Sequence, residues 1–148
     1  MKEISDKILI IWVLKAEEDL LAAKSLLDMN SEDSFGDIIC FHAQQTAEKY
    51  LKAFLYFHGH SFEKTHDIDY LVGLCSKIDD DFTSLETENL TEYAVSVRYP
   101  DMQLWTEPDE AAEALNAAEN IAELVRKKLD INTGKVKKWK TEMVNQSK

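Results

Sequence analysis

Apolar residues recur at every third or fourth position over long stretches of the chain, separated by short polar connections. Along residues 6–29 this spacing places the apolar side chains on one face of a helix. The same spacing predicts four further helices: residues 34–57, then helices beginning at Thr65, Thr83 and Thr106. No alternating apolar and polar pattern predicts a strand. The sequence therefore predicts an all-α fold, an antiparallel up-and-down bundle of about four to five helices.

Polar residues at the expected helix starts support these boundaries. Ser5 is the predicted N-cap of the first helix and Thr65 that of the third, with Asp67 in its first turn. Three pairs resemble capping boxes: Ser34 with Asp37, Thr83 with Glu86, and Thr106 with Asp109. The fourth helix should end near Arg98, because Pro100 disfavours a helical conformation in the residue before it.

The second predicted helix has two faces of different chemistry. Its apolar face comprises Cys40, Ala43, Ala47, Tyr50, Leu51 and Phe54. Its polar face comprises His42, Gln45, Lys49 and Lys52. We expect the apolar face to pack in the core and the polar face to contact a ligand.

Composition favours one domain followed by a tail. The chain of 148 residues is 45% hydrophobic with 4 Gly and 2 Pro, which favours long helices over turn-rich structure. We expect a bundle over residues 1–130 and a basic tail over residues 131–148. The 2 Cys show no metal-ligand spacing, and His58 with His60 lack a third ligand nearby, so no metal or other cofactor is expected.

An apolar run over residues 8–14 resembles the core of a signal peptide, but acidic residues flank it and it is too short to span a bilayer. We expect a cytoplasmic protein that does not contact a membrane.

The charge is unevenly distributed along the chain. Residues 1–125 hold 9 Lys and Arg against 26 Asp and Glu, whereas residues 126–148 hold 8 against 2. An acidic body disfavours broad nucleic-acid binding. In the tail, Val136, Trp139 and Met143 would share one face of a short basic helix that docks on an acidic partner or a phosphate backbone. A frayed terminus is the alternative.

Four sequence strings together resemble the HEPN family over about residues 8–130. They are Ala16-Glu17-Glu18-Asp19-Leu20, Phe41-His42-Ala43-Gln44-Gln45-Thr46-Ala47-Glu48-Lys49, Thr65-His66-Asp67 and Arg98-Tyr99-Pro100-Asp101. The resemblance implies a small helical bundle that is usually homodimeric and often encoded beside a minimal nucleotidyltransferase as a toxin and antitoxin pair. Some members of this family are metal-independent ribonucleases, and others bind nucleotides or other substrates.

The catalytic signature of the ribonuclease branch, an Arg followed four to six residues later by a His, is absent. The corresponding positions hold Met102, Gln103 and Leu104 after Arg98, and Asp130, Ile131 and Asn132 after Arg126. The chain has no other arginine. The sequence therefore assigns no catalytic residue.

Helical alignment and the resemblance together point to a pocket for a phosphate or nucleotide. Its candidate residues are His42, Gln45, Lys49, His66, Arg98 and Tyr99. Three of them have structural alternatives: His42 bonded to a neighbouring backbone group, His66 merely opening a helix, and Arg98 holding the end of its own helix or pairing with Asp101. The resemblance implies a nucleotide- or RNA-binding homodimer that works with a nucleotidyltransferase; the alternatives are a metal-independent endoribonuclease toxin with a divergent site and a non-catalytic adaptor.

Overall fold

The computed structural model describes residues 4–29, 36–87, 89–96 and 106–147. Within these ranges the chain forms six α-helices and one short 3₁₀ helix, and no strand. The elements are α1 (Lys7–Asp28), α2 (Gly36–Phe57), α3 (Ile68–Ile78), η1 (Asp80–Ser84), α4 (Leu90–Ser96), α5 (Pro108–Leu129) and α6 (Thr133–Gln146). This confirms the predicted all-α bundle.

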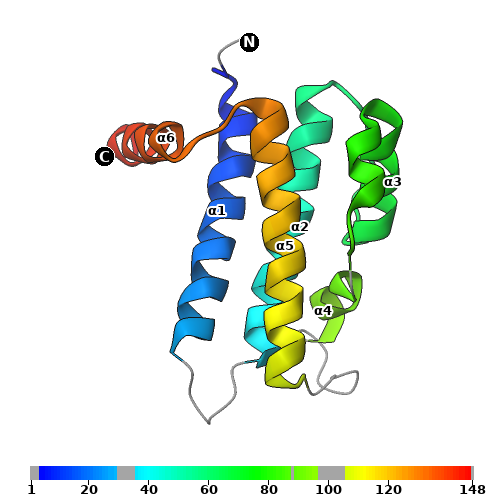
Figure 1. Cartoon of the computed structure of the whole chain (residues 1–148). Coiled ribbons are helices and arrows are strands. Elements are labelled where there is room, and N and C mark those ends of the chain that lie inside the picture. Colours follow the sequence, from blue (N-terminus) through cyan, green and yellow to red (C-terminus); the bar gives the residue numbers. More distant parts are fainter. Residues whose placement is uncertain (1–3, 30–35, 88, 97–105, 148) are drawn as a thin grey trace.

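Helix α2 lies at the centre of the fold. It contacts α1 and α5 along much of its length, and α3 and α4 pack against another side of it (Figure 1). Helix α1 runs antiparallel to both α2 and α5. The apolar face predicted for α2 is almost completely buried, with exposed fractions of 0–1% from Cys40 to Phe54. The core therefore forms where the 3.6-residue pattern predicts it.

Helix α1 begins one residue later than predicted, and its cap is Asp6 instead of Ser5. Asp6 Oδ1 accepts hydrogen bonds from the backbone N–H groups of Ile8 at 2.9 Å and Leu9 at 3.3 Å. A carboxylate satisfies these otherwise unpaired donors, and its negative charge also interacts favourably with the positive end of the helix dipole. The hydroxyl of Tyr56 on α2 donates to the same carboxylate.

The caps predicted at three other threonines are wrong. Asp67, not Thr65, caps α3 by accepting from Tyr70 N–H at 3.1 Å, while Thr65 Oγ1 accepts from Asp67 N–H. Thr83 lies inside η1, where its hydroxyl donates to a backbone carbonyl. Thr106 instead bonds through its N–H and hydroxyl to Asp37 Oδ1, joining the starts of α5 and α2. Ser34 lies outside the described residues.

The tail forms an ordered helix and not a frayed end over its described part. Helix α6 is capped by Asn132, whose side-chain oxygen accepts from Lys135 N–H at 2.8 Å. It contacts α1 and projects away from the long axis of the bundle (Figure 1). Val136, Trp139 and Met143 share one face as predicted, but that face packs against the core of the same chain and not on a partner, and Trp139 is only 6% exposed. These apolar contacts hold the helix on the bundle.

A left-handed turn connects α5 to α6. Asp130 adopts φ 55° and ψ 49°, and its N–H donates to the Lys127 carbonyl while Ile131 N–H donates to the Arg126 carbonyl at 2.8 Å. These bonds are those of a Schellman motif, which ends a helix and redirects the chain. Of the helices formed by the described residues, none combines the length and apolar character needed to cross a membrane.

Candidate functional site

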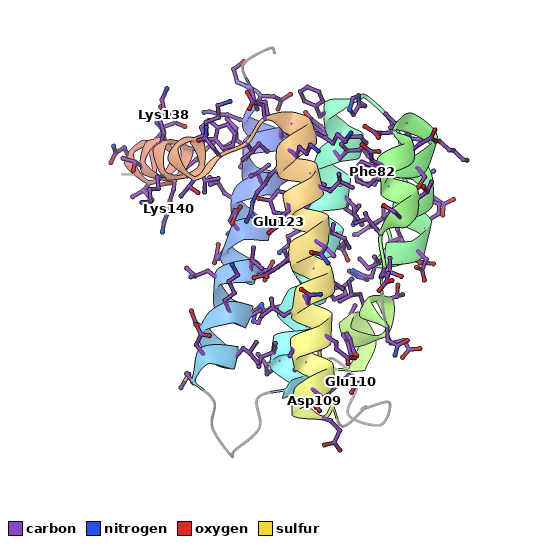
Figure 2. All side chains as sticks on the ribbon, in the orientation of Figure 1. Phe82, Asp109, Glu110, Glu123, Lys138 and Lys140 are labelled. Atoms are coloured by element: carbon purple, nitrogen blue, oxygen red, sulfur yellow. The ribbon has the colours of Figure 1, made fainter. Side chains whose placement is uncertain are left out.

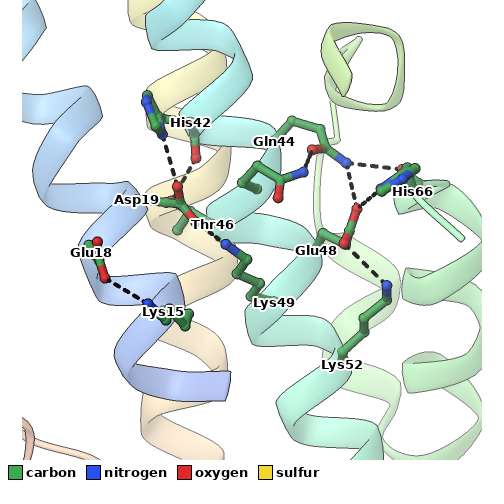
Figure 3. A network of polar contacts seen from close by, with 11 residues as sticks. Lys15, Glu18, Asp19, His42, Gln44, Thr46, Glu48, Lys49, Lys52 and His66 are labelled. Atoms are coloured by element: carbon green, nitrogen blue, oxygen red, sulfur yellow. Dashed lines mark hydrogen bonds and ion pairs between the residues drawn. The ribbon is translucent and has the colours of Figure 1, made fainter. Parts of the chain in front are cut away.

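The polar face of α2 places ionisable side chains on both sides of the helix (Figure 3). Toward α1 lies the α1–α2 cluster, defined by Asp19, His42 and Lys49. Toward α3 lies the α2–α3 cluster, defined by Gln44, Gln45, Glu48, Lys52 and His66. Polar groups buried in a helical bundle are costly unless they are hydrogen-bonded, so both clusters need a complete set of partners.

In the α1–α2 cluster a single carboxylate holds an imidazole and an ammonium group. Asp19 Oδ1 lies 2.9 Å from His42 Nδ1, and Asp19 Oδ2 lies 2.5 Å from Lys49 Nζ. The Asp19 side chain is 12% exposed, whereas His42 and Lys49 are 28% and 22% exposed. The carboxylate is therefore mostly buried and its two partners reach the surface above it.

In the α2–α3 cluster the carboxylate of Glu48 has three partners. Its Oε1 accepts from the Gln44 amide at 3.1 Å and lies 2.6 Å from His66 Nδ1. Its Oε2 accepts from Lys52 Nζ at 3.1 Å. The Glu48 side chain is 6% exposed and that of His66 is 48% exposed. A buried carboxylate thus orients an imidazole ring that faces solvent.

The two glutamines complete this cluster. Gln44 donates to both the Glu48 carboxylate and the His66 backbone carbonyl, each at 3.1 Å. Gln45 donates to Gln44 Oε1 at 2.6 Å and is 8% exposed. No buried side-chain nitrogen or oxygen among the described residues lacks a hydrogen-bond partner. The cluster is therefore a complete network that also locks the approach of the chain into α3.

Lys52 does not lie on an open surface as its place on the polar face of α2 predicted. Its side chain is 7% exposed, and its ammonium group lies 5.8 Å from the centre of the Trp12 ring and 5.9 Å from that of Phe62. These two aromatic rings cover the cation from α1 and from the connection before α3. Lys52 consequently supports Glu48 from inside and does not meet a ligand.

A third polar group ties α1, α2 and α5 together. The Tyr50 hydroxyl donates to Glu17 Oε1, and Arg126 Nε donates to the same carboxylate oxygen at 2.8 Å. Burial, followed by the charge of Glu17, raises the pKa of Tyr50, so the phenol stays protonated and acts as a donor. These residues position the helices: Tyr50 is fully buried, and the side chains of Arg126 and Glu17 are 27% and 21% exposed.

Four of the six predicted site residues lie in the two clusters, and the other two lie outside the described residues. His42 and Lys49 share Asp19, whereas Gln45 and His66 are connected through Gln44. Arg98 and Tyr99 lie outside the described residues.

Sequence reasoning did not select the carboxylates Asp19 and Glu48 or the amide of Gln44, although all three lie in the strings compared above. Gln44, Glu48 and Lys52 are spaced by four residues, which predicts side-chain contact along one helix face.

His66 is the described side chain best placed to act on a ligand. An imidazole whose Nδ1 is held by a carboxylate presents Nε2 outward, where it can accept or donate a proton or contact a phosphate oxygen. Among the described residues, no group of three or more His, Cys, Asp and Glu side chains is arranged to bind a metal ion. The chemistry available at these clusters is that of acids, bases and cations.

A shallow cleft of about 340 Å³ lies elsewhere, between the end of α1 and the start of α5. An ion pair of 2.9 Å between Lys24 and Glu119 crosses it. Neither cluster on α2 contributes to its lining. Because Lys24, the one cation in its lining, already pairs with Glu119, the cleft is a weaker candidate than the oriented histidine.

Comparison with known proteins identifies relatives of this chain. The sequence model of the HEPN domain family matches residues 10–128. A Methanocaldococcus jannaschii protein named "Putative toxin MJ1304" is 32% identical over 133 residues, covering 78% of this chain and 84% of that protein. Helix α6 lies beyond the matched domain.

Two solved structures share the fold at 24% identity. One, described as an archaeal HEPN homologue, covers 87% of this chain and 99% of its own with a TM-score of 0.57. The other, from Thermus thermophilus, covers 82% and 98% with a TM-score of 0.58.

Proposed function

The chain belongs to the HEPN family, and from that premise we propose that it is a toxin-like HEPN protein that binds a nucleotide or an RNA end. The polar face of α2 and the residues beside it form the binding surface. A minimal nucleotidyltransferase restrains the protein, and the functional unit is a cytoplasmic homodimer. The name of the Methanocaldococcus jannaschii relative supports the toxin-like part of this proposal.

The observation that carries the proposal is the pairing of His66 with Glu48. Glu48 is buried, bonded to Gln44 and Lys52, and paired with the His66 ring. A histidine that only precedes a helix would not need its ring held in this way. Asp67 already caps α3, so His66 is not needed for that purpose. Ring orientation by a buried acid is a common way to prepare an imidazole for proton transfer or anion contact.

His42 and Lys49 supply further polar groups for a phosphate, on the side of α2 that faces α1. Gln45 belongs to the α2–α3 cluster, where it supports the neighbouring glutamine. Arg98 and Tyr99 complete the proposed site. An arginine is suited to this role because its guanidinium group binds phosphate through two hydrogen bonds.

Isothermal titration with a panel of nucleoside mono-, di- and triphosphates tests this proposal. We expect at least one nucleotide to bind and His66→Gln to weaken its affinity about tenfold or more, as loss of a charge-assisted contact does. His60→Gln is the matched control, because the His60 imidazole bonds to the neighbouring Ser61 carbonyl and lies outside both clusters. Absence of heat with every nucleotide, or equal loss in both variants, would contradict the proposal.

The paired imidazole also favours a second candidate, a metal-independent endoribonuclease. Such an enzyme needs groups that take and give protons near the scissile phosphate, and His66 has the required orientation. Incubation of the protein with RNA in EDTA tests this activity. Cleavage that disappears in His66→Gln supports the enzyme, and binding without cleavage supports the binding protein.

A non-catalytic adaptor is distinguished by its partner. It would neither bind nucleotide nor cleave RNA, yet it would co-purify with a second protein. Co-expression of the chain with the product of the gene encoded beside it tests this possibility and the nucleotidyltransferase partner together.

A further inference from the structure

One exposed side of α6 carries two lysines in a stripe of four residues. Lys137, Lys140, Thr141 and Val144 lie three or four residues apart in the helix and are all exposed. They form the outer stripe of α6, which lies beside the face from which Val136, Trp139 and Met143 pack against the bundle; Lys140 borders that face and Lys137 lies farther from it. Figure 2 shows Lys138 and Lys140 extending from opposite sides of the helix. The outer stripe contains no acidic residue.

The lysines of this stripe are not neutralised by the acidic body. Lys137 and Lys140 make no ion pair with any described residue, although residues 1–125 hold 26 Asp and Glu. In contrast, Lys135 on another side of α6 pairs with Asp130 at 3.4 Å. Helix α6 therefore presents these positive charges to solvent, where they are available to a separate anion.

We propose that the outer stripe of α6 binds the phosphodiester backbone of single-stranded RNA. A protein partner would require apolar or aromatic anchors, since lysine is depleted at protein interfaces and hot spots are commonly aromatic. The aromatic residue of α6, Trp139, faces inward and is 6% exposed. The outer stripe carries two lysines and no aromatic residue, and Val144 is its one apolar side chain, which matches a ligand recognised by its charge better than a protein partner.

The helix is preformed for this purpose. Asn132 caps its first turn, and the contacts of Trp139 hold it against the bundle before any ligand arrives. RNA binding would thus not require the cost of folding a disordered tail. The acidic body repels the rest of the strand and confines backbone contact to α6.

The choice of RNA rests on the proposed function. A toxin-like protein that binds an RNA end at the α2 face would bind the RNA more tightly if α6 also contacted the same strand. The α6 stripe and the α2 face nevertheless contain different residues. Each can therefore be tested without the other.

Fluorescence anisotropy with a labelled, unstructured single-stranded RNA oligonucleotide tests this inference at several salt concentrations. The variant Lys137→Gln/Lys140→Gln should bind at least tenfold more weakly than the wild type. The slope of log affinity against log salt should fall by about 1.4, because each lost phosphate contact removes about 0.7.

The matched control is Lys77→Gln/Lys138→Gln, which removes the same charge from exposed positions outside the stripe. The RNA affinity of this control variant should fall less than threefold. Equal losses in the two double variants would overturn the inference, as would no binding of RNA by the wild type. Competition by polyglutamate as strong as that by unlabelled RNA would also overturn it, in favour of an acidic protein partner.

Two further measurements separate this inference from the proposed function. RNA binding that depends on Lys137 and Lys140 but persists in His66→Gln supports the α6 stripe even where titration with nucleotides gives no heat. Nucleotide binding with no effect of the Lys137→Gln/Lys140→Gln variant on RNA affinity supports the α2 site alone. Unchanged circular dichroism and melting temperature in the variant exclude loss of α6 as the cause.

Discussion

Glu48 and Lys52 form an ion pair one helical turn apart on α2, with both side chains no more than 7% exposed and 3.1 Å between Oε2 and Nζ. The pair is buried because Trp12 and Phe62 cover the ammonium group. Such a pair adds little net stability compared with apolar residues, but removal of one member leaves an uncompensated charge in a poorly solvated place. Its role here is to hold Glu48 where it meets His66.

We predict that Lys52→Met lowers the free energy of unfolding by about 3 kcal/mol, the typical cost of breaking a buried pair. Urea denaturation followed by circular dichroism measures this change. Lys24→Met is the control, since Lys24 is half exposed and pairs with Glu119 at the surface. Its cost should stay below about 1 kcal/mol. A similar loss of unfolding free energy in both variants would show that the Glu48–Lys52 pair is effectively solvated.

The buried hydroxyl of Tyr50 gives a second prediction. Tyr50→Phe removes the donor to Glu17 and the acceptor of Arg126, although Glu17 and Arg126 still contact each other at 2.6 Å. We expect a loss of about 1–2 kcal/mol, the usual cost of a buried hydrogen bond to a charged group. Tyr56→Phe, which removes an exposed bond to Asp6, is the control and should change the unfolding midpoint less.

The two thiols should be unreactive in the folded protein. Burial raises the pKa of both Cys40 and Cys75 to about 12. Relative to an ordinary thiol, the thiolate fraction at pH 8 falls about a thousandfold, and only the thiolate attacks a disulfide reagent. Absorbance with an aromatic disulfide reagent should show slow labelling in buffer and rapid labelling of two thiols in urea. Rapid labelling of either thiol without denaturant would contradict their burial.

Acid should destabilise the fold partly through His58. Partial burial lowers the pKa of His58, opposed by the charge of Asp79, and the Phe54 and Phe57 rings pack against its imidazole. A histidine with a lowered folded pKa contributes stability above its unfolded pKa of about 6.5, and this stability is lost as the pH falls through the folded value. The melting temperature should therefore fall from pH 7.5 to pH 5.

The variant His58→Gln isolates that contribution. Its melting temperature should fall less over the same pH range, because a glutamine side chain carries no titrating proton. His60→Gln is the control and should follow the wild type. An identical fall in all three proteins would assign the acid sensitivity to other groups.

Periodicity predicted the apolar core well because helical contacts are local. Cys40, Ala43 and Phe54 are buried as their spacing requires. Burial of the polar residue Lys52 could not be predicted in the same way, because its covering rings come from distant parts of the chain. The capping residues were predicted less well, because each observed cap has a close neighbour with a similar preference for the N-cap position. Asp6 follows Ser5 directly, and Asp67 lies two residues after Thr65.

The candidate site was predicted by residue type but not by pairing. His42 and Asp19 are 23 residues apart, and His66 and Glu48 are 18 apart, so neither contact follows from a helical repeat. In a chain with 28 Asp and Glu, no single carboxylate stands out from the sequence. The tail posed a similar problem: its pattern allowed a helix, but only docking of Trp139 on the rest of the fold decides between a helix and a frayed end.

The left-handed turn at Asp130 sets the direction in which α6 leaves the end of α5. Lys135 braces it by donating to the Asp130 carbonyl at 2.7 Å. A strand held by α6 would then approach α2 from the direction that this turn sets.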